Sequence, residues 1–240
     1  MFRIIISLLF AIGFLIVSLP VLGVLALIGL FAPNVRMRAA MAIIRWAFRV
    51  LVKLAGIRLT VLGREHLPAG RAALYVGNHR SIYDIIIAYT LLPPPAGIVA
   101  KESLSRIPIF SVWEKLICCL FLDRNDLRSG MRMIQKGTEQ LSAGISMYIC
   151  PEGTRNKAAC DLPLLPFHEG SFRMATKCDA PIVPVAISNA IGIWEAHPKK
   201  IVPTEVTVRF CAPIETAGLD RSAKKQLGET CKKIMEEAMS

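Results

Sequence analysis

The sequence predicts an α/β fold, in which a largely parallel or mixed sheet is covered by helices and is preceded by an N-terminal apolar helical membrane segment. Seven short apolar runs alternate with helical stretches after residue 56, which is typical of a sheet buried on both faces. The first 35 residues contain a 32-residue stretch without a charge. We expect residues 1–55 to form membrane-associated helices and residues 56–240 to form the α/β domain.

The first element is the uncharged stretch between Arg3 and Arg36, which is long enough to cross a bilayer as a helix. A signal peptide is disfavoured because the stretch is too long and no small-residue cleavage site precedes a polar start. A single spanning helix fits the pattern. A helical hairpin that bends near Ser18-Leu19-Pro20 and enters one leaflet fits it equally, because periodicity does not separate the two.

The next element is a helix over residues 34–55 with a basic face. On a helical wheel its cations fall within about 80° of one another: Arg38, Arg45, Arg49 and Lys53. A solvated face is the ordinary alternative, but the helix directly follows the membrane segment. We therefore expect an interfacial helix that faces anionic head groups. Such cations mark the cytoplasmic side, so we expect the catalytic domain on that face of the membrane.

The composition excludes several classes of protein. Disordered chains are poor in apolar residues, whereas 53% of this chain is hydrophobic. The seven cysteines include no C-x-x-C pair, so we expect reduced thiols, no disulfide framework and no metal site. The net charge is +11, but residues 1–64 hold eight cations and no acid. Because the basicity lies beside the apolar segment, we expect a bilayer with anionic lipids as partner and no nucleic acid.

The α/β part is predicted from apolar runs and the helical stretches between them. We expect strands at 57–62, 72–76, 97–100, 118–122, 145–150, 182–187 and 205–210. We expect helices near 82–92, 108–117, 126–142, 169–178 and 220–238.

Residues 78–84, Asn-His-Arg-Ser-Ile-Tyr-Asp, carry a histidine and an aspartate in H-x4-D spacing directly after an expected strand. Ser81 and Asp84 fit a capping box at the start of the next helix, which explains these two residues but not His79. Asp84 can also turn an oxygen towards the imidazole of His79 and fix its tautomer. A carboxylate has two oxygens, so both roles can hold.

Polar groups also follow three other expected strands. Lys101 comes directly after the run 97–100, at the edge where α/β sheets bind ligands, although a solvated lysine is an equal alternative. Arg124 follows the run 118–122, where a surface ion pair is the ordinary reading. Residues 152–155, Glu-Gly-Thr-Arg, form a turn after the run 145–150. Such a turn can offer N–H groups, a hydroxyl and a guanidinium to a phosphate.

Pro184 lies inside the expected strand 182–187. Proline removes a donor from the ladder, so it implies an edge strand, a strand start or a bulge. We expect a packing role for it beside the site.

In this order the segments resemble the glycerophospholipid acyltransferase family, most closely the 1-acylglycerol-3-phosphate acyltransferases. That family's N-H-x-S-x-x-D, arginine-bearing second block, E-G-T-R and V-P-V blocks match Asn78–Asp84, Leu122–Asn125, Glu152–Arg155 and Val183–Val185. The resemblance covers about residues 60–190, and the apolar N-terminus fits the family's two-helix membrane motif. A related family segment often has a lysine where His168 or Glu169 stands here, so we assign that loop no phosphate role.

The resemblance implies transfer of an acyl chain from acyl-ACP or acyl-CoA to the free hydroxyl of lysophosphatidic acid, giving phosphatidic acid in phospholipid synthesis. It implies no cofactor beyond the thioester co-substrate. His79 would be the general base, oriented by Asp84. The substrate-binding residues would be Lys101, Arg124, Glu152, Gly153, Thr154 and Arg155, with the cations on the acceptor phosphate and N–H groups near Gly153 on the oxyanion. Structural residues at the site would be Asn78, Ser81 and Pro184.

Two other functions are weighed against this one. The same chemistry could use another acceptor: glycerol 3-phosphate, another lysophospholipid or a lyso-aminolipid. A non-enzymatic membrane-surface binding protein is disfavoured because the polar residues of the resemblance are intact. Ser81 is disfavoured as an acyl-enzyme nucleophile because its capping role explains it and no G-x-S-x-G elbow surrounds it. Cys150 is expected to be a packed thiol.

Overall fold

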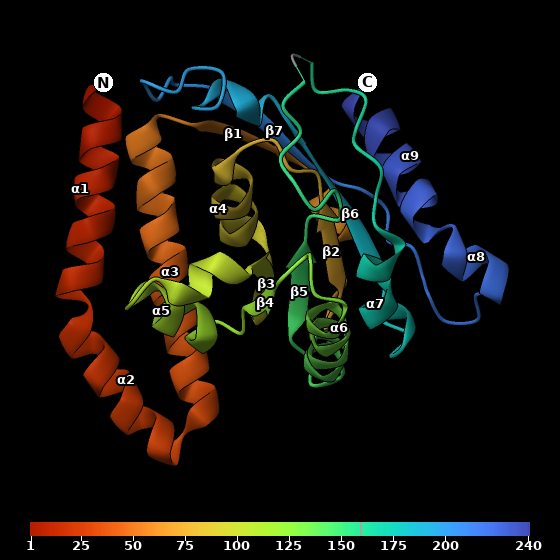
Figure 1. The fold of residues 1–240 in the computed structure, drawn as a ribbon, viewed down its shortest axis with the longest axis horizontal. Helices are drawn as coiled ribbons and strands as arrows, with labels where there is room; N and C mark the ends of the chain where they lie inside the picture. Colours follow the sequence, from red (N-terminus) through yellow and green to blue (C-terminus); the bar gives the residue numbers. More distant parts are fainter. Residues whose placement is uncertain (159) are drawn as a thin grey trace.

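The centre of the fold is a seven-stranded sheet in the order β1-β7-β6-β2-β5-β3-β4 (Figure 1). The computed structural model describes residues 1–158 and 160–240. The strands are β1 (Arg58–Leu62), β2 (Leu74–Gly77), β3 (Ala96–Lys101), β4 (Leu120–Leu122), β5 (Ser146–Ile149), β6 (Ile182–Ser188) and β7 (Glu205–Phe210). Each of the seven predicted strands overlaps one of these.

The helices also fall where the sequence predicts them, and the last of them is divided in two at Gln226. The α-helices are α1 (Phe2–Val17), α2 (Leu19–Phe31), α3 (Pro33–Ala55), α4 (Ile82–Leu91), α5 (Phe110–Leu116), α6 (Leu127–Ser142), α7 (Arg173–Thr176), α8 (Arg221–Lys225) and α9 (Leu227–Met239). Short 3₁₀ turns are η1 (Arg64–His66), η2 (Glu102–Arg106), η3 (Glu169–Phe172) and η4 (Ala190–Gly192).

The sheet is mixed. The neighbours β6, β2, β5, β3 and β4 run parallel, whereas β7 is antiparallel to β6 and parallel to β1. The fold class is therefore confirmed in its mixed form. The carboxyl ends of five strands consequently meet at one edge of the sheet, which is where α/β folds place ligands.

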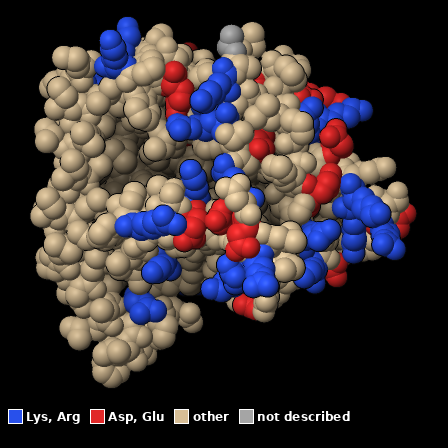
Figure 2. Space-filling view, viewed as in Figure 1, with Lys and Arg blue, Asp and Glu red and all other residues tan. Residues whose placement is uncertain are grey.

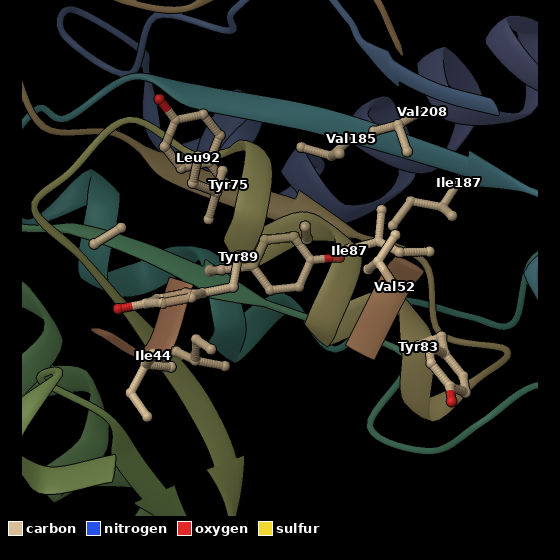
Figure 3. Close-up of a cluster of buried hydrophobic side chains, with 14 of the residues drawn as sticks. Ile44, Val52, Tyr75, Tyr83, Ile87, Tyr89, Leu92, Val185, Ile187 and Val208 are labelled. Carbon is tan, nitrogen blue, oxygen red and sulfur yellow. The ribbon is translucent and has the colours of Figure 1, made fainter. Parts of the chain in front are cut away.

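Helices cover both faces of the sheet because alternate side chains of each strand point to opposite faces. Tyr75 and Val183 belong to a buried cluster shared with α3, α4 and α5, and Figure 3 shows part of it. Val76 and Ala186 belong to a second cluster shared with α6, α7 and α9. Burial on both faces explains why the central strands are continuous apolar runs.

Pro184 lies in β6, which is an interior strand between β7 and β2, so of the three alternatives the edge strand is excluded. The carbonyl oxygen of Pro184 accepts a hydrogen bond from the N–H of Cys211 at 2.9 Å, and the β6–β7 ladder begins at the next residue, Val185. The N–H that proline lacks would extend this ladder beyond the end of β7. The missing donor therefore falls in an interruption of the pairing, between this ladder and the isolated antiparallel bridge that joins Ile182 to Ile214.

The first three helices form an antiparallel hairpin beside the sheet (Figure 1). Within the described residues no single helix has the length and composition to cross a bilayer, whereas α1 and α2 meet that requirement together, bent by 46°. The bend falls at Ser18, as expected, and its hydroxyl accepts a hydrogen bond from Nε1 of Trp113 at 3.0 Å. An unbroken spanning helix is therefore not formed. The chain turns back at Ala32, and Arg3 Nη1 donates to the carbonyl of Leu54 at 2.8 Å.

The outward face of this hairpin is apolar. Figure 2 shows a flank almost without charge along α1 and α2. Exposed side chains on it include Phe2, Leu9, Ile16, Leu27 and Phe31. Continuous apolar exposure of this kind marks a surface that contacts a membrane or a partner. Contact with a bilayer stays a prediction for this flank.

Helix α3 has the basic face expected of residues 34–55. Arg38, Arg49 and Lys53 are exposed, and Arg45 is half-buried. The opposite side of α3 shares the core with the sheet, through Ala40, Ile44 and Ala55 among others. Gly56 ends the helix in the left-handed region, with φ +75°. Helix α3 thus ends at Ala55, and the division of the chain into two parts at this residue stays a prediction.

Candidate active site

The predicted site residues meet at the carboxyl edge of the parallel strands. His79 follows β2, Glu152 and Arg155 follow β5, Lys101 ends β3, and Arg124 follows β4. The register pairs Lys101 with Leu122, so the ends of β3 and β4 lie level with each other. Lys101, Arg124 and Arg155 are exposed. Four strands of the sheet therefore bring one imidazole and three cations to a single edge.

Asp84 holds the imidazole of His79 at the N-terminus of α4. Nδ1 of His79 lies 3.2 Å from Oδ2 of Asp84, and the His79 side chain is 17% exposed. The same Oδ2 accepts hydrogen bonds from the N–H groups of Arg80 and Ser81, at 2.6 and 2.7 Å. The Ser81 hydroxyl accepts from the N–H of Tyr83 at 3.1 Å and completes the capping box.

One oxygen of Asp84 therefore serves both capping and orientation, and the two oxygens do not divide these roles as the sequence suggested. The other oxygen, Oδ1, is buried without a partner among the described residues. Because Nδ1 contacts Asp84, Nε2 is the nitrogen of His79 that is left to exchange a proton with a substrate.

Asn78 fixes the end of β2 to β6. Its Nδ2 donates to the carbonyl of Ile187 and its Oδ1 accepts from the N–H of Ile187, both at 2.8 Å. This reciprocal pair replaces a backbone pair where β2 leaves the sheet. The strand end that carries His79 is therefore held by a neighbouring strand.

Glu152 ties the turn after β5 to the turn after β2. Its Oε1 accepts from the N–H of His79 at 2.7 Å, and its Oε2 accepts from the N–H of Leu165 at 3.1 Å. The residue is 4% exposed. Burial raises the pKa of the Glu152 carboxyl, against the opposing effect of these two donors. Both oxygens are thus engaged by backbone donors of the protein itself.

Arg155 is held by an acid that the sequence pattern does not single out, Glu195. Nη1 of Arg155 lies 3.0 Å from Oε1 of Glu195, and the same oxygen accepts from the N–H of Ile82 at 2.9 Å. The two side chains are 44% and 18% exposed, respectively. Ile82 is the first residue of α4, so Glu195 places Arg155 beside the helix that carries Asp84.

Arg80 is a second side chain at the candidate site that the sequence pattern leaves unassigned. It is fully buried, its guanidinium donates to the carbonyls of Ala158 and Cys160, and Nε lies 3.4 Å from Oδ1 of Asp161. A buried guanidinium requires such partners. Arg80 therefore anchors the segment that follows Arg155. The only sequence signal for this role was the presence of an arginine within residues 78–84. Its partners lie about 80 positions away, so the local pattern does not reveal them.

The turn at residues 152–155 differs from expectation at Gly153. Gly153 has φ +68°, and a Cβ there would lie 3.0 Å from Nε2 of His168. Its N–H donates to the carbonyl of Cys150 at 3.2 Å, so this group is used inside the turn.

Burial raises the pKa of the Cys150 thiol well above its usual range, while the nearby Arg124 acts in the opposite direction. Cys150 is thus held as a thiol, as predicted.

The loop at 168–169 serves the fold. Both carboxylate oxygens of Glu169 accept from the N–H of Gly228, at 3.0 and 3.2 Å, near the start of α9. An acid at a helix N-terminus is a stabilising arrangement. The carboxylate of Glu169 is therefore used within the fold.

Comparison with known proteins supports the resemblance seen in the sequence. The family model described as Acyltransferase matches residues 58–188. The 1-acyl-sn-glycerol-3-phosphate acyltransferase of Saccharomyces cerevisiae is 31% identical over 196 residues, which cover 80% of this chain and 62% of that protein. The beta enzyme of Homo sapiens is 30% identical, with 81% and 69% covered. The Escherichia coli enzyme is 30% identical, with 70% and 67% covered.

A solved structure shows the same fold. The crystal structure of the 1-acyl-sn-glycerophosphate (LPA) acyltransferase PlsC from Thermotoga maritima aligns with a TM-score of 0.78. The alignment covers 98% of this chain and 95% of that one, at 21% identity. The likeness therefore includes the N-terminal helices as well as the sheet.

Proposed function

The chain belongs to the acyltransferase family, and from this membership we propose that it transfers an acyl chain from an acyl thioester to lysophosphatidic acid, giving phosphatidic acid. The observation that carries the proposal is the contact between His79 and Asp84, 3.2 Å long, at the carboxyl edge of the sheet. The names of the curated relatives favour lysophosphatidic acid as the acceptor.

The reaction needs a base for an alcohol. In our proposal Nε2 of His79 takes the proton from the acceptor hydroxyl as its oxygen attacks the thioester carbonyl. The new C–O bond forms, the C–S bond breaks, and the thiolate leaves with the proton that His79 carried. Asp84 stabilises the imidazolium in between. We assign the oxyanion to N–H groups other than that of Gly153, which is occupied within its turn.

The acceptor phosphate needs cations, and we propose Arg155 with Arg124 and Lys101. Arginine binds phosphate oxygens in a bidentate fork, which adds direction to charge. Glu195 holds Arg155 beside α4 before substrate arrives, so the guanidinium is already placed. We assign Glu152 a positioning role, because both its oxygens are engaged by the backbone.

The apolar flank of α1 and α2 suits this reaction, because acceptor and product are both lipids. We propose that the enzyme binds a bilayer with anionic lipids through this flank, with the catalytic domain on the cytoplasmic face. The donor is an acyl thioester of coenzyme A or of acyl carrier protein. Both are anionic, and the exposed cations at the site edge would attract either one.

A panel of acceptors tests the function. Purified full-length protein is incubated with acyl-CoA or acyl-ACP and with lysophosphatidic acid, glycerol 3-phosphate, lysophosphatidylcholine or a lyso-aminolipid. Products are identified by mass spectrometry. We expect phosphatidic acid to form fastest. Faster turnover of another acceptor would overturn the assignment of lysophosphatidic acid, and no product from any pair would overturn the reaction.

Glu195→Ala is expected to raise the KM for lysophosphatidic acid by about tenfold, the equivalent of roughly 1.4 kcal/mol of lost binding. The change releases Arg155 from its position, whereas kcat should fall less because His79 and Asp84 are untouched. Glu195→Gln keeps a carbonyl oxygen for Arg155 and Ile82, so it should recover most of the affinity. The control is Glu205→Ala, which removes an exposed acid 3.1 Å from Arg58 on β1. An unchanged KM in Glu195→Ala would refute this placement of Arg155.

A further inference from the structure

A cavity of about 460 Å³ lies at the end of α4 opposite to His79 and Asp84. Its walls come from α3, from the last turn of α4 with the residues after it, and from β1 and η1. Helix α4 has ten residues and is about 15 Å long. The cavity is thus separated from the catalytic pair by the length of that helix, and it is a different site.

Three arginines line this cavity: Arg45 and Arg49 from α3, and Arg64 from η1. None of the other lining residues is an acid. In the part of the chain that the structure describes, none of these three guanidinium groups takes part in an ion pair. Three unpaired cations around one hollow create a strong preference for an anion.

Arg45 supplies the second observation. Its Nη2 is buried and has no hydrogen-bond partner among the described residues. Its guanidinium carbon lies over the Tyr89 ring, 5.9 Å from the ring centre, in a cation–π contact. Burial lowers the pKa of Arg45, Tyr89 acts in the opposite direction, and Arg49, one turn along α3, has a smaller effect that also lowers the pKa. An anion between the two arginines would remove this repulsion and satisfy the buried donor.

We propose that Arg45, Arg49 and Arg64 bind the phosphate of an anionic glycerophospholipid in this cavity. Phosphate is the oxyanion that several arginine forks coordinate best. Val52, Leu59 and Leu67 line the same cavity and suit the glycerol and the first acyl carbons. The volume holds a head group but not two chains, so the chains must leave towards the bilayer. The site goes beyond the transfer reaction, because it holds a lipid that does not react.

Labelling of arginines tests the site directly. Full-length protein in neutral detergent micelles is treated with phenylglyoxal, and the modification rate of each arginine is followed by peptide mass spectrometry. Dioctanoyl phosphatidic acid at about ten times its Kd is expected to slow modification of Arg49 and Arg64 by about tenfold. Arg38, which is exposed on the same helix outside the cavity, should react at an unchanged rate.

Two further additives separate the sources of phosphate. Equal protection by inorganic phosphate at the same concentration would show that the ligand is a free anion and not a lipid head group. Equal protection by dioctanoyl phosphatidylcholine would show that the acyl chains bind without charge recognition, which overturns the proposal. Absence of protection with every additive would also overturn it.

A pair of double variants guards against misfolding. R49Q/R64Q removes two cations from the cavity and leaves Arg45 packed on Tyr89, while R38Q/K53Q removes two from the same helix outside it. Phosphatidic acid is also the product of the proposed reaction, so it should raise the Tm of all three proteins through the active site. The shift should be larger in the wild type and in R38Q/K53Q than in R49Q/R64Q, which keeps the active site but lacks two cations of the cavity. Without lipid, R49Q/R64Q should melt at or above the wild-type Tm because repulsion is relieved. An equal lipid-induced shift in both double variants would contradict the site.

Discussion

Replacing His79 with alanine is expected to lower kcat for phosphatidic acid formation by about 10²–10⁴-fold, which is what a positioned general base contributes. The variant loses the group that takes the proton from the acceptor hydroxyl, while the cations at the sheet edge remain. The KM for lysophosphatidic acid should therefore change little. The fold should persist, because Asp84 keeps its hydrogen bonds to the N–H groups of Arg80 and Ser81. Initial rates at several concentrations of lysophosphatidic acid give kcat and KM, and a thermal melt shows whether the fold persists.

His197→Ala is the matched control, since His197 is exposed and lies two residues beyond Glu195, outside the hydrogen bonds that join His79 to Asp84. Its kcat should equal that of the wild type. Retention of more than a tenth of the activity in His79→Ala would rule out the proposed base. Asp84→Asn is less informative, because an amide has one acceptor oxygen and one donor nitrogen. It would disturb the capping box and the imidazole together, so a loss of activity would not separate the two.

Regular structure and the location of the site could be predicted from the sequence. The central strands are continuous apolar runs, and each of the seven strands expected from the sequence overlaps one in the structure. Because the parallel strands end at one edge, chemistry-bearing residues after 76, 100, 122 and 150 had to meet there. The capping box at Ser81 and Asp84 was readable because both partners lie within one helical turn. Local patterns therefore predict local contacts and the edge at which they gather.

The remaining contacts of the site are long-range and leave no local pattern. Glu195 lies 113 positions from Ile82 and 40 from Arg155, and nothing around it distinguishes it from a surface acid. The partners of Glu152 are backbone groups of His79 and Leu165, and any residue type presents such groups. The sequence therefore placed Glu152 with the substrate-binding residues, whereas its geometry indicates a support for the turn that carries His79.

Periodicity also could not decide the shape of the N-terminus. A bent pair of apolar helices and a straight one have the same composition, and Pro20 alone does not fix an angle. In the structure a tertiary contact lies at the bend, where Nε1 of Trp113 on α5 donates a hydrogen bond to the hydroxyl of Ser18. The return of the chain at Ala32 is completed by Arg3, which reaches the last turn of α3. Both contacts join segments that are 95 and 51 positions apart.

The second large effect is expected from Glu152, and it should appear in stability. Glu152→Ala leaves the buried N–H groups of His79 and Leu165 without acceptors, at about 1–3 kcal/mol each. Glu152→Gln should lose nearly as much, because its amide offers one acceptor oxygen to two donors and turns an NH₂ group towards the other. At about 2–4 °C per kcal/mol, the Tm should fall by several degrees, measured without substrate. Glu65→Gln, at an exposed acid, should leave the Tm unchanged. If Glu152→Gln instead kept its Tm and raised only the KM for lysophosphatidic acid, Glu152 would be a substrate-binding residue, and the support assigned to it here would be wrong.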